Sequence, residues 1–215
     1  MYKIKYRFII ISVLILTFGV SCHDLDELNI NPNGVDPATA DLNLLMPTIV
    51  TGVGRTVVSL GFGNIAGVMQ HTQKDGWSSG HNDYDWDNQD QSWSGYYGIL
   101  RNNDDYYSKA VDGGYEFHQG VALIMEAYTF GLITDLWGDA PYSEALKGEE
   151  GAEYFKPVYD SQKDIYMGIL ASLEAANTLL SKDDASYTNI NQVQDGQVFM
   201  LWQILVMLLR LLIIV

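Results

Sequence analysis

Aromatic side chains within a polar stretch are the residues of this sequence best suited to binding a small molecule. Trp77, Tyr84 and Trp86 fall within residues 73–90, a segment rich in Ser, Asn, Asp and Gly, and Trp93 follows it. Indole and phenol rings offer flat apolar faces to sugar rings, while neighbouring amides and carboxylates form hydrogen bonds with hydroxyls. The segment has no helical period, and long polar loops are often functional. These four aromatics are therefore the candidate ligand-binding residues, with simple packing of the loop as the alternative.

Three acids in the same segment raise the question of calcium. Asp83, Asp85 and Asp87 alternate as they do at the start of a calcium-binding loop. Such a loop needs Gly at its sixth position and Glu at its twelfth, where this chain has Asn88 and Ser94. Calcium is therefore the weaker alternative, and we predict no metal site and no cofactor.

Carboxylates also cluster further along the chain, where Asp135, Asp139 and Glu144 could supply the acid pair of a glycoside hydrolase. Such a pair must face across a cleft, and the pattern here instead indicates the end of a helix. Gly138 follows the last apolar residues, and Pro141 comes three residues later. The sequence also contains no phosphate-binding loop. We therefore predict a binding protein and not an enzyme.

The N-terminus has the pattern of a bacterial lipoprotein signal peptide. Basic residues precede a short apolar run, and the run is followed by Ser21 and by Cys22, the only cysteine of the chain. The run is too short to span a bilayer, whereas acyl chains such as palmitate on Cys22 would anchor the protein to a membrane. We predict a signal peptide over residues 1–21, lipidation of Cys22 and a tether over residues 22–38.

The overall charge restricts the class of ligand. The 215 residues carry a formal net charge of −15. Binding to nucleic acid depends on cations that neutralise phosphates, so this balance argues against a nucleic-acid partner. It favours a neutral or cationic ligand.

Apolar residues at helical spacing predict a mainly α fold to position these groups. We expect helices over residues 39–72, in two pieces, and over residues 92–111 and 118–137. Pro47 lies inside the first piece, where it allows a kink or a later start of the helix. Ser161 and Asp164 form a capping box before a further helix. Two stripes of buried residues are expected. In the helix over residues 118–137 the stripe is Val121, Met125, Tyr128, Leu132 and Leu136, and in the last helix it is Ile165, Ile169, Leu173, Ala176 and Leu180.

Three motifs resemble the SusD/RagB-like family of nutrient-binding outer-membrane lipoproteins. They are TDLWGDAPYSEAL at residues 134–146, LNINPN at residues 28–33 and the segment that begins YDSQ at residue 159. The resemblance implies a TPR-like array of helical pairs with long surface loops over residues 39–200. It also implies a lipid-anchored, surface-exposed protein of the outer membrane that binds a glycan or other small nutrient together with a TonB-dependent transporter.

Two alternatives remain at this point. The chain could be a structural lid of the transporter that binds no ligand, or a truncated fragment without function. The apolar residues 201–215 depart from the family pattern, so the resemblance covers residues 1 to about 195 and we expect a frameshift or truncation near Met200.

Overall fold

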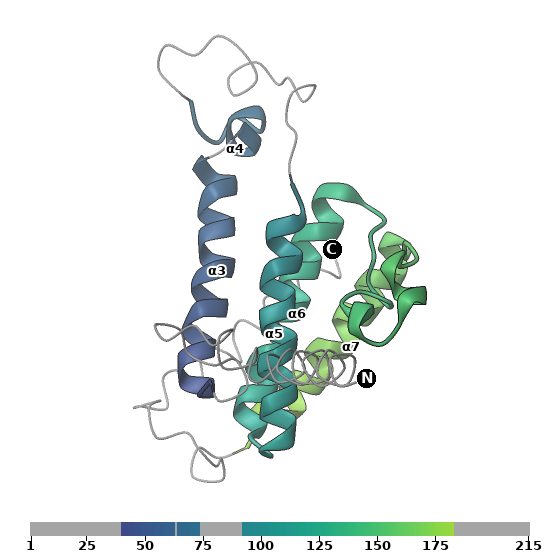
Figure 1. Cartoon of the computed structure of the whole chain (residues 1–215). Coiled ribbons are helices and arrows are strands. Elements are labelled where there is room, and N and C mark those ends of the chain that lie inside the picture. Colours follow the sequence, from purple (N-terminus) through teal and green to yellow (C-terminus); the bar gives the residue numbers. More distant parts are fainter. Residues whose placement is uncertain (1–39, 63, 74–91, 183–215) are drawn as a thin grey trace, which may run out of the picture. The chain divides into compact units, whose positions relative to one another are not determined.

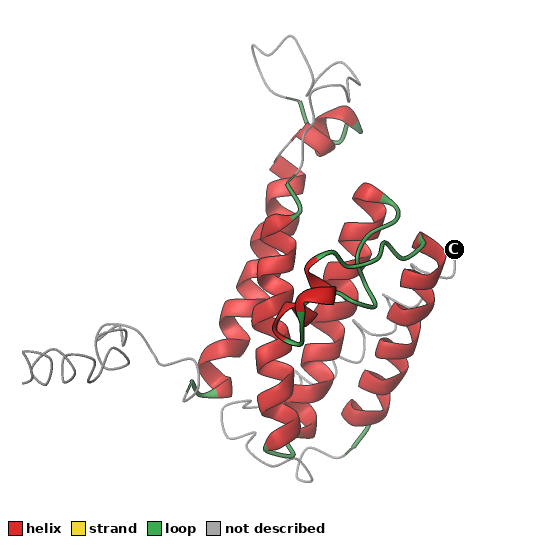
Figure 2. Cartoon of the chain, turned by 45° about the vertical axis from the view of Figure 1, so that its right-hand side comes forward, coloured by secondary structure: helices red, strands yellow, loops and turns green. Residues whose placement is uncertain are grey.

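The computed structural model describes residues 40–62, 64–73 and 92–182, and the described residues form helices and connecting turns. In chain order the elements are α3 (Leu42–Phe62), α4 (Asn64–Val68), α5 (Ser94–Asp112), α6 (Glu116–Trp137), the 3-10 helices η2 (Lys147–Glu149) and η3 (Ala152–Phe155), and α7 (Gln162–Leu180). Helices α5, α6 and α7 pack in sequence order, and α3 packs along α5 (Figures 1 and 2). The prediction of a mainly helical protein is confirmed for these residues.

Helix α6 is the centre of this arrangement. It packs against both α5 and α7, so most of its circumference is apolar and buried. The predicted stripe describes only part of this surface, because Val121 and Met125 are buried while the other three members are only partly so. The remaining buried apolar side chains lie on other faces of the helix: Phe117, Ala122, Ile124, Ala127, Phe130 and Ile133. A helix between two neighbours needs this wider apolar surface.

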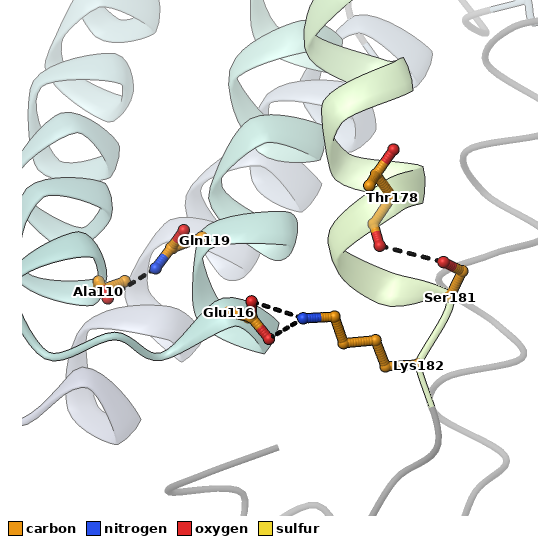
Figure 3. A network of polar contacts seen from close by, with 6 residues as sticks. All are labelled: Ala110, Glu116, Gln119, Thr178, Ser181 and Lys182. Atoms are coloured by element: carbon orange, nitrogen blue, oxygen red, sulfur yellow. Dashed lines mark hydrogen bonds and ion pairs between the residues drawn. The ribbon is translucent and has the colours of Figure 1, made fainter. Parts of the chain in front are cut away.

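Helix α7 closes the pair with α6 in an antiparallel direction. Its start is capped as predicted, since the Ser161 side chain accepts a hydrogen bond from Asp164 N at 3.2 Å. Its predicted stripe is confirmed in full by the buried residues Ile165, Ile169, Leu173, Ala176 and Leu180. At the other end, Lys182 Nζ donates to both carboxylate oxygens of Glu116, at 2.6 and 2.5 Å, joining the end of α7 to the start of α6 (Figure 3).

A buried polar layer links α5 to α6. Tyr106 Oη lies 2.7 Å from His118 Nδ1, and Asn103 Nδ2 donates to Ala122 O at 3.0 Å. Burial raises the pKa of Tyr106, so this hydroxyl stays protonated and can donate to the imidazole. These bonds specify the antiparallel register of the two helices.

Helices α3 and α4 correspond to the two pieces expected over residues 39–72. Asp41 Oδ1 accepts from Asn43 N at 2.9 Å at the start of α3, and this helix then continues through Pro47. The break comes after Phe62 and not near the proline. Residues 42–61 are long and apolar enough to cross a membrane by length and composition alone, and 11% of the most apolar stretch is buried. The buried side chains that pack into the core with α5 are Leu42, Ile49 and Val53.

Candidate functional site

The end of α6 forms a sharp corner that places the candidate site. Gly138 adopts a φ of +76°, as the predicted helix stop requires, and its N–H donates to Thr134 O at 2.8 Å. The Thr134 hydroxyl donates in turn to Gly138 O at 2.8 Å. The chain therefore leaves the helix in a direction that is defined by its last turn.

Asp160 holds the far side of this corner. Its backbone forms an isolated antiparallel bridge with Ala140, and its Oδ2 accepts from Tyr142 N at 3.0 Å and Ser143 N at 2.8 Å. The Ser143 hydroxyl donates to Oδ1 at 2.8 Å. Burial acts to raise the pKa of Asp160, but these hydrogen bonds outweigh it and lower the pKa below its ordinary value. The carboxylate thus stays charged and serves as a structural acceptor.

The acids that sequence patterns offered as a hydrolytic pair have the same kind of role. Asp139 Oδ1 accepts from Gln162 N at 2.9 Å, at the start of α7, and Glu144 Oε2 accepts from Val158 N at 3.0 Å. Asp135 accepts a short hydrogen bond from the Tyr166 hydroxyl, which raises the pKa of Tyr166 to about 12. Asp135 and Asp139 thus join the end of α6 to α7, and Glu144 joins the corner to the segment before α7. None of these contacts sets two of the acids across a cleft.

An aromatic cluster lies beside the corner, and Trp93 is at its centre. The Trp93 ring lies 5.8 Å from that of Tyr97, 6.0 Å from Trp137 and 5.8 Å from Tyr159, measured between centroids. Tyr96 packs edge-on against Trp137 at 5.3 Å. Tyr159 is 61% exposed and Trp93 is half-buried, so the cluster reaches the surface. These rings come from the start of α5, the end of α6 and the segment before α7.

Further contacts fix the cluster to the corner. The Tyr97 hydroxyl donates to Pro141 O at 2.6 Å. Burial, and then the nearby Tyr159 and Asp160, raise the pKa of Tyr97 to about 12, so it remains a donor at neutral pH. Phe130 of α6 packs edge-on against Tyr142 at 4.7 Å. The aromatic surface is therefore held by the helix ends and does not depend on a free loop.

A second feature of the corner is a cavity of about 250 Å³ between α5, α6 and residues 142–150. Its lining includes the carboxyl groups of Asp104 and Glu126, and Lys147 lies at the same cavity. Burial, and then the charge of Asp104, raise the pKa of Glu126 to about 7. Burial, and then Asp105 and Glu150, also raise the pKa of Asp104. The cavity thus holds carboxyl groups that retain protons more readily than exposed ones.

The structure describes only one of the four predicted ligand-binding residues. Trp93 lies in the aromatic cluster, whereas Trp77, Tyr84 and Trp86 lie outside the described residues, as do Asp83, Asp85 and Asp87. Within the described ranges, no three His, Cys, Asp or Glu side chains are placed to hold a metal ion. Sequence reasoning missed Tyr159, which stands just before the predicted capping residue Ser161. The signal available in the sequence was an aromatic residue close to the predicted start of a helix.

The described helices α5, α6 and α7 thus pack in sequence order, with an aromatic surface beside the end of α6. The chain belongs to the SusD-like family described as starch-binding and associating with the outer membrane, whose sequence model matches residues 36–211. That match extends past residue 195, where the motif-based resemblance ended. A comparison with proteins of curated function finds no match.

Solved structures support the same family. A SusD homolog from Bacteroides fragilis NCTC 9343 is 28% identical with a TM-score of 0.51, and the alignment covers 67% of this chain and 29% of that one. An outer membrane protein from Bacteroides vulgatus ATCC 8482, for which a role in nutrient binding has been suggested, is 30% identical with a TM-score of 0.51, over 64% of this chain and 28% of that one. The predicted TPR-like helical fold is confirmed. The chain spans less than a third of either relative.

Proposed function

We propose that this protein is a lipid-anchored, surface-exposed protein of the outer membrane that binds a carbohydrate nutrient without turning it over. In this proposal it delivers the carbohydrate to a TonB-dependent transporter. The family description, with its reference to starch and the outer membrane, supports the general role. The single observation that carries the ligand class is the exposed aromatic cluster of Trp93 and Tyr159.

The two rings suit one face of a sugar. Tyr97 and Trp137 support Trp93 from behind, while Tyr159 stands 61% exposed with its plane at 44° to that of Trp93. Stacking on an aromatic ring contributes on the order of 1–3 kcal/mol in nucleic-acid binding, and sugar faces present a similar apolar surface. Trp93 directly follows the segment that contains Trp77, Tyr84 and Trp86, so these three stay in the proposed site. The carboxylates at the corner accept structural hydrogen bonds, which favours binding over hydrolysis.

Removal of the exposed ring tests this site. We expect Tyr159→Ala to weaken binding of a malto-oligosaccharide to the full chain by about tenfold, which corresponds to roughly 1.4 kcal/mol, in titration calorimetry. Trp93→Ala is expected to have at least this effect, with helix content followed by circular dichroism because Trp93 also packs against Trp137. Phe155→Ala is the matched control, since Phe155 is an aromatic of the same connecting segment and is 71% exposed. Equal affinities of the Tyr159 and Phe155 variants would remove the aromatic cluster from the site.

The anchor is tested separately. Cys22→Ala is expected to abolish incorporation of labelled palmitate and to move the protein from the membrane to the soluble fraction, because the thiol that carries the lipid is absent. Ser21→Ala keeps a small residue before the cysteine and should remain lipidated. Continued palmitate labelling of the Cys22 variant would show that the acyl chain is attached elsewhere.

A further inference from the structure

A groove of about 580 Å³ runs between α3 and α5. None of the residues that line it belongs to the aromatic cluster. Arg55 of α3 and Arg101 of α5 both line it, together with Thr51 and Asn102. Two arginines from different helices thus line one groove in a chain whose net charge is −15.

Within residues 40–62, 64–73 and 92–182, neither arginine forms an ion pair with an acid. The ion pairs among the described residues join Lys109 to Asp105 and Lys182 to Glu116, and they involve neither guanidinium. Asp105 stands one helical turn after Arg101 and would be its natural partner on α5, but its carboxylate is bound by Lys109 at 2.6 Å. Among the described residues, the two cations of the groove are therefore not compensated by an ion pair.

The floor of the groove has a second unusual property. Gly95 and Gly98 line it from α5, where glycine is less favourable for the helix than alanine. A Cβ at either position would meet nothing within 4 Å, so packing does not require a glycine there. Gly52 is different, since its Cβ would lie 3.3 Å from Ile99 Cγ1 at the contact between α3 and α5. The bare backbone at residues 95 and 98 keeps the groove open.

We infer that this groove binds the carboxylate of an acidic saccharide, a uronate, as a site separate from the aromatic cluster. Guanidinium groups bind carboxylates through paired, charge-assisted hydrogen bonds. Thr51 and Asn102 supply a hydroxyl and an amide for sugar hydroxyls, and the volume is in the range of small-molecule sites. The inference rests on the proposed function for its saccharide part. It differs from the expectation that the net charge favours a neutral or cationic ligand, because net charge does not describe a local pair of cations.

An anionic membrane surface is the less suitable partner for the same groove. Recognition of anionic lipids typically uses clusters of four to eight Lys or Arg residues, whereas this groove has Arg55 and Arg101 in an acidic chain. A single carboxylate therefore matches two guanidinium groups better than an anionic membrane surface does.

The test compares trigalacturonate with maltotriose, each titrated into the full chain in detergent. We expect Arg55→Gln and Arg101→Gln each to weaken trigalacturonate binding about tenfold and to leave maltotriose binding unchanged. Lys163→Gln is the control, because it removes the same charge from an exposed residue of α7. Equal trigalacturonate affinities of the arginine and lysine variants would overturn the inference, as would arginine-dependent binding to vesicles of anionic phospholipid without binding of trigalacturonate.

The glycines provide a readout that a structural role would not produce. Gly95→Ala and Gly98→Ala are each expected to raise the melting temperature, because alanine favours the helix, and at the same time to weaken trigalacturonate binding, because the new methyl group narrows the groove. A higher melting temperature with unchanged affinity would contradict the inference. If maltotriose binds in a Tyr159-dependent way while trigalacturonate binds no better, this inference fails and the proposed function stands; if neither saccharide binds, both fail.

Discussion

Glu126→Gln is expected to stabilise the protein at pH 8 by about 2–3 kcal/mol and to change its stability little at pH 4. Burial and the charge of Asp104 raise the pKa of Glu126 to about 7 from an ordinary 4.5. At pH values between these two pKa values, the folded protein binds more protons than the unfolded chain. The free energy of unfolding therefore falls as pH rises. The difference between the two pKa values corresponds to roughly 3 kcal/mol, which glutamine removes because it carries no charge at any pH.

Urea denaturation of the full chain at pH 4, 6 and 8, followed by circular dichroism, measures this effect. Glu149→Gln removes the same charge from an exposed position of η2 and should shift stability by at most about 0.5 kcal/mol at each pH. Asp104→Asn should reduce the advantage of the glutamine variant, since it removes the repulsion that helps to raise the pKa of Glu126. The other charged groups that line the cavity, Lys147 and Glu150, remain in every variant. A pH-independent gain from Glu126→Gln would show that folding does not raise the pKa of Glu126.

Helix α7 was predicted in full because it buries only one face. Its stripe from Ile165 to Leu180 is the set of residues that are buried, and Ser161 caps it. The residue range of helix α6 was predicted, but the full extent of its buried surface was not. Its second apolar face becomes buried only because α7 packs on the side opposite α5. In α3, Pro47 does not delay the start of the helix, since α3 begins at Leu42 and continues past the proline.

The site was predicted less completely, for a physical reason. Trp93 was a candidate because it is an aromatic residue next to a polar segment. Its neighbours Trp137 and Tyr159 are distant in the sequence, and the corner at Gly138 brings them beside it. Glu126 had a signal that was not used, as it is a carboxylate in the apolar middle of α6. The pairing of Arg55 with Arg101 across two helices has no local pattern. The spacing of residues in the sequence does not by itself predict contacts between distant segments.

Gly168→Ala is expected to destabilise the protein by about 2 kcal/mol, although alanine is normally the better helix residue. A Cβ at Gly168 of α7 would lie 2.3 Å from the Tyr142 hydroxyl oxygen and 2.5 Å from its Cε1, so the ring could not keep its place. Tyr142 is held there by Phe130 at 4.7 Å and by its own N–H bond to Asp160, and a displaced ring would pull the corner away from α7.

Gly131→Ala supplies the matched control, because Gly131 lies in the middle of α6 and a Cβ there would meet nothing within 4 Å. This variant should instead be stabilised by roughly 0.5–1 kcal/mol. In the double variant Gly168→Ala, Tyr142→Ala the alanine at residue 168 should no longer be harmful, which a double-mutant cycle measures as a coupling of about 2 kcal/mol. Since the corner also holds Pro141, which accepts the bond from Tyr97, Gly168→Ala should weaken malto-oligosaccharide binding at the aromatic cluster, whereas Gly131→Ala should not. Additive effects of the two substitutions would mean that Tyr142 does not rest on Gly168, and the corner would then be held by Asp160 and not by its tyrosine.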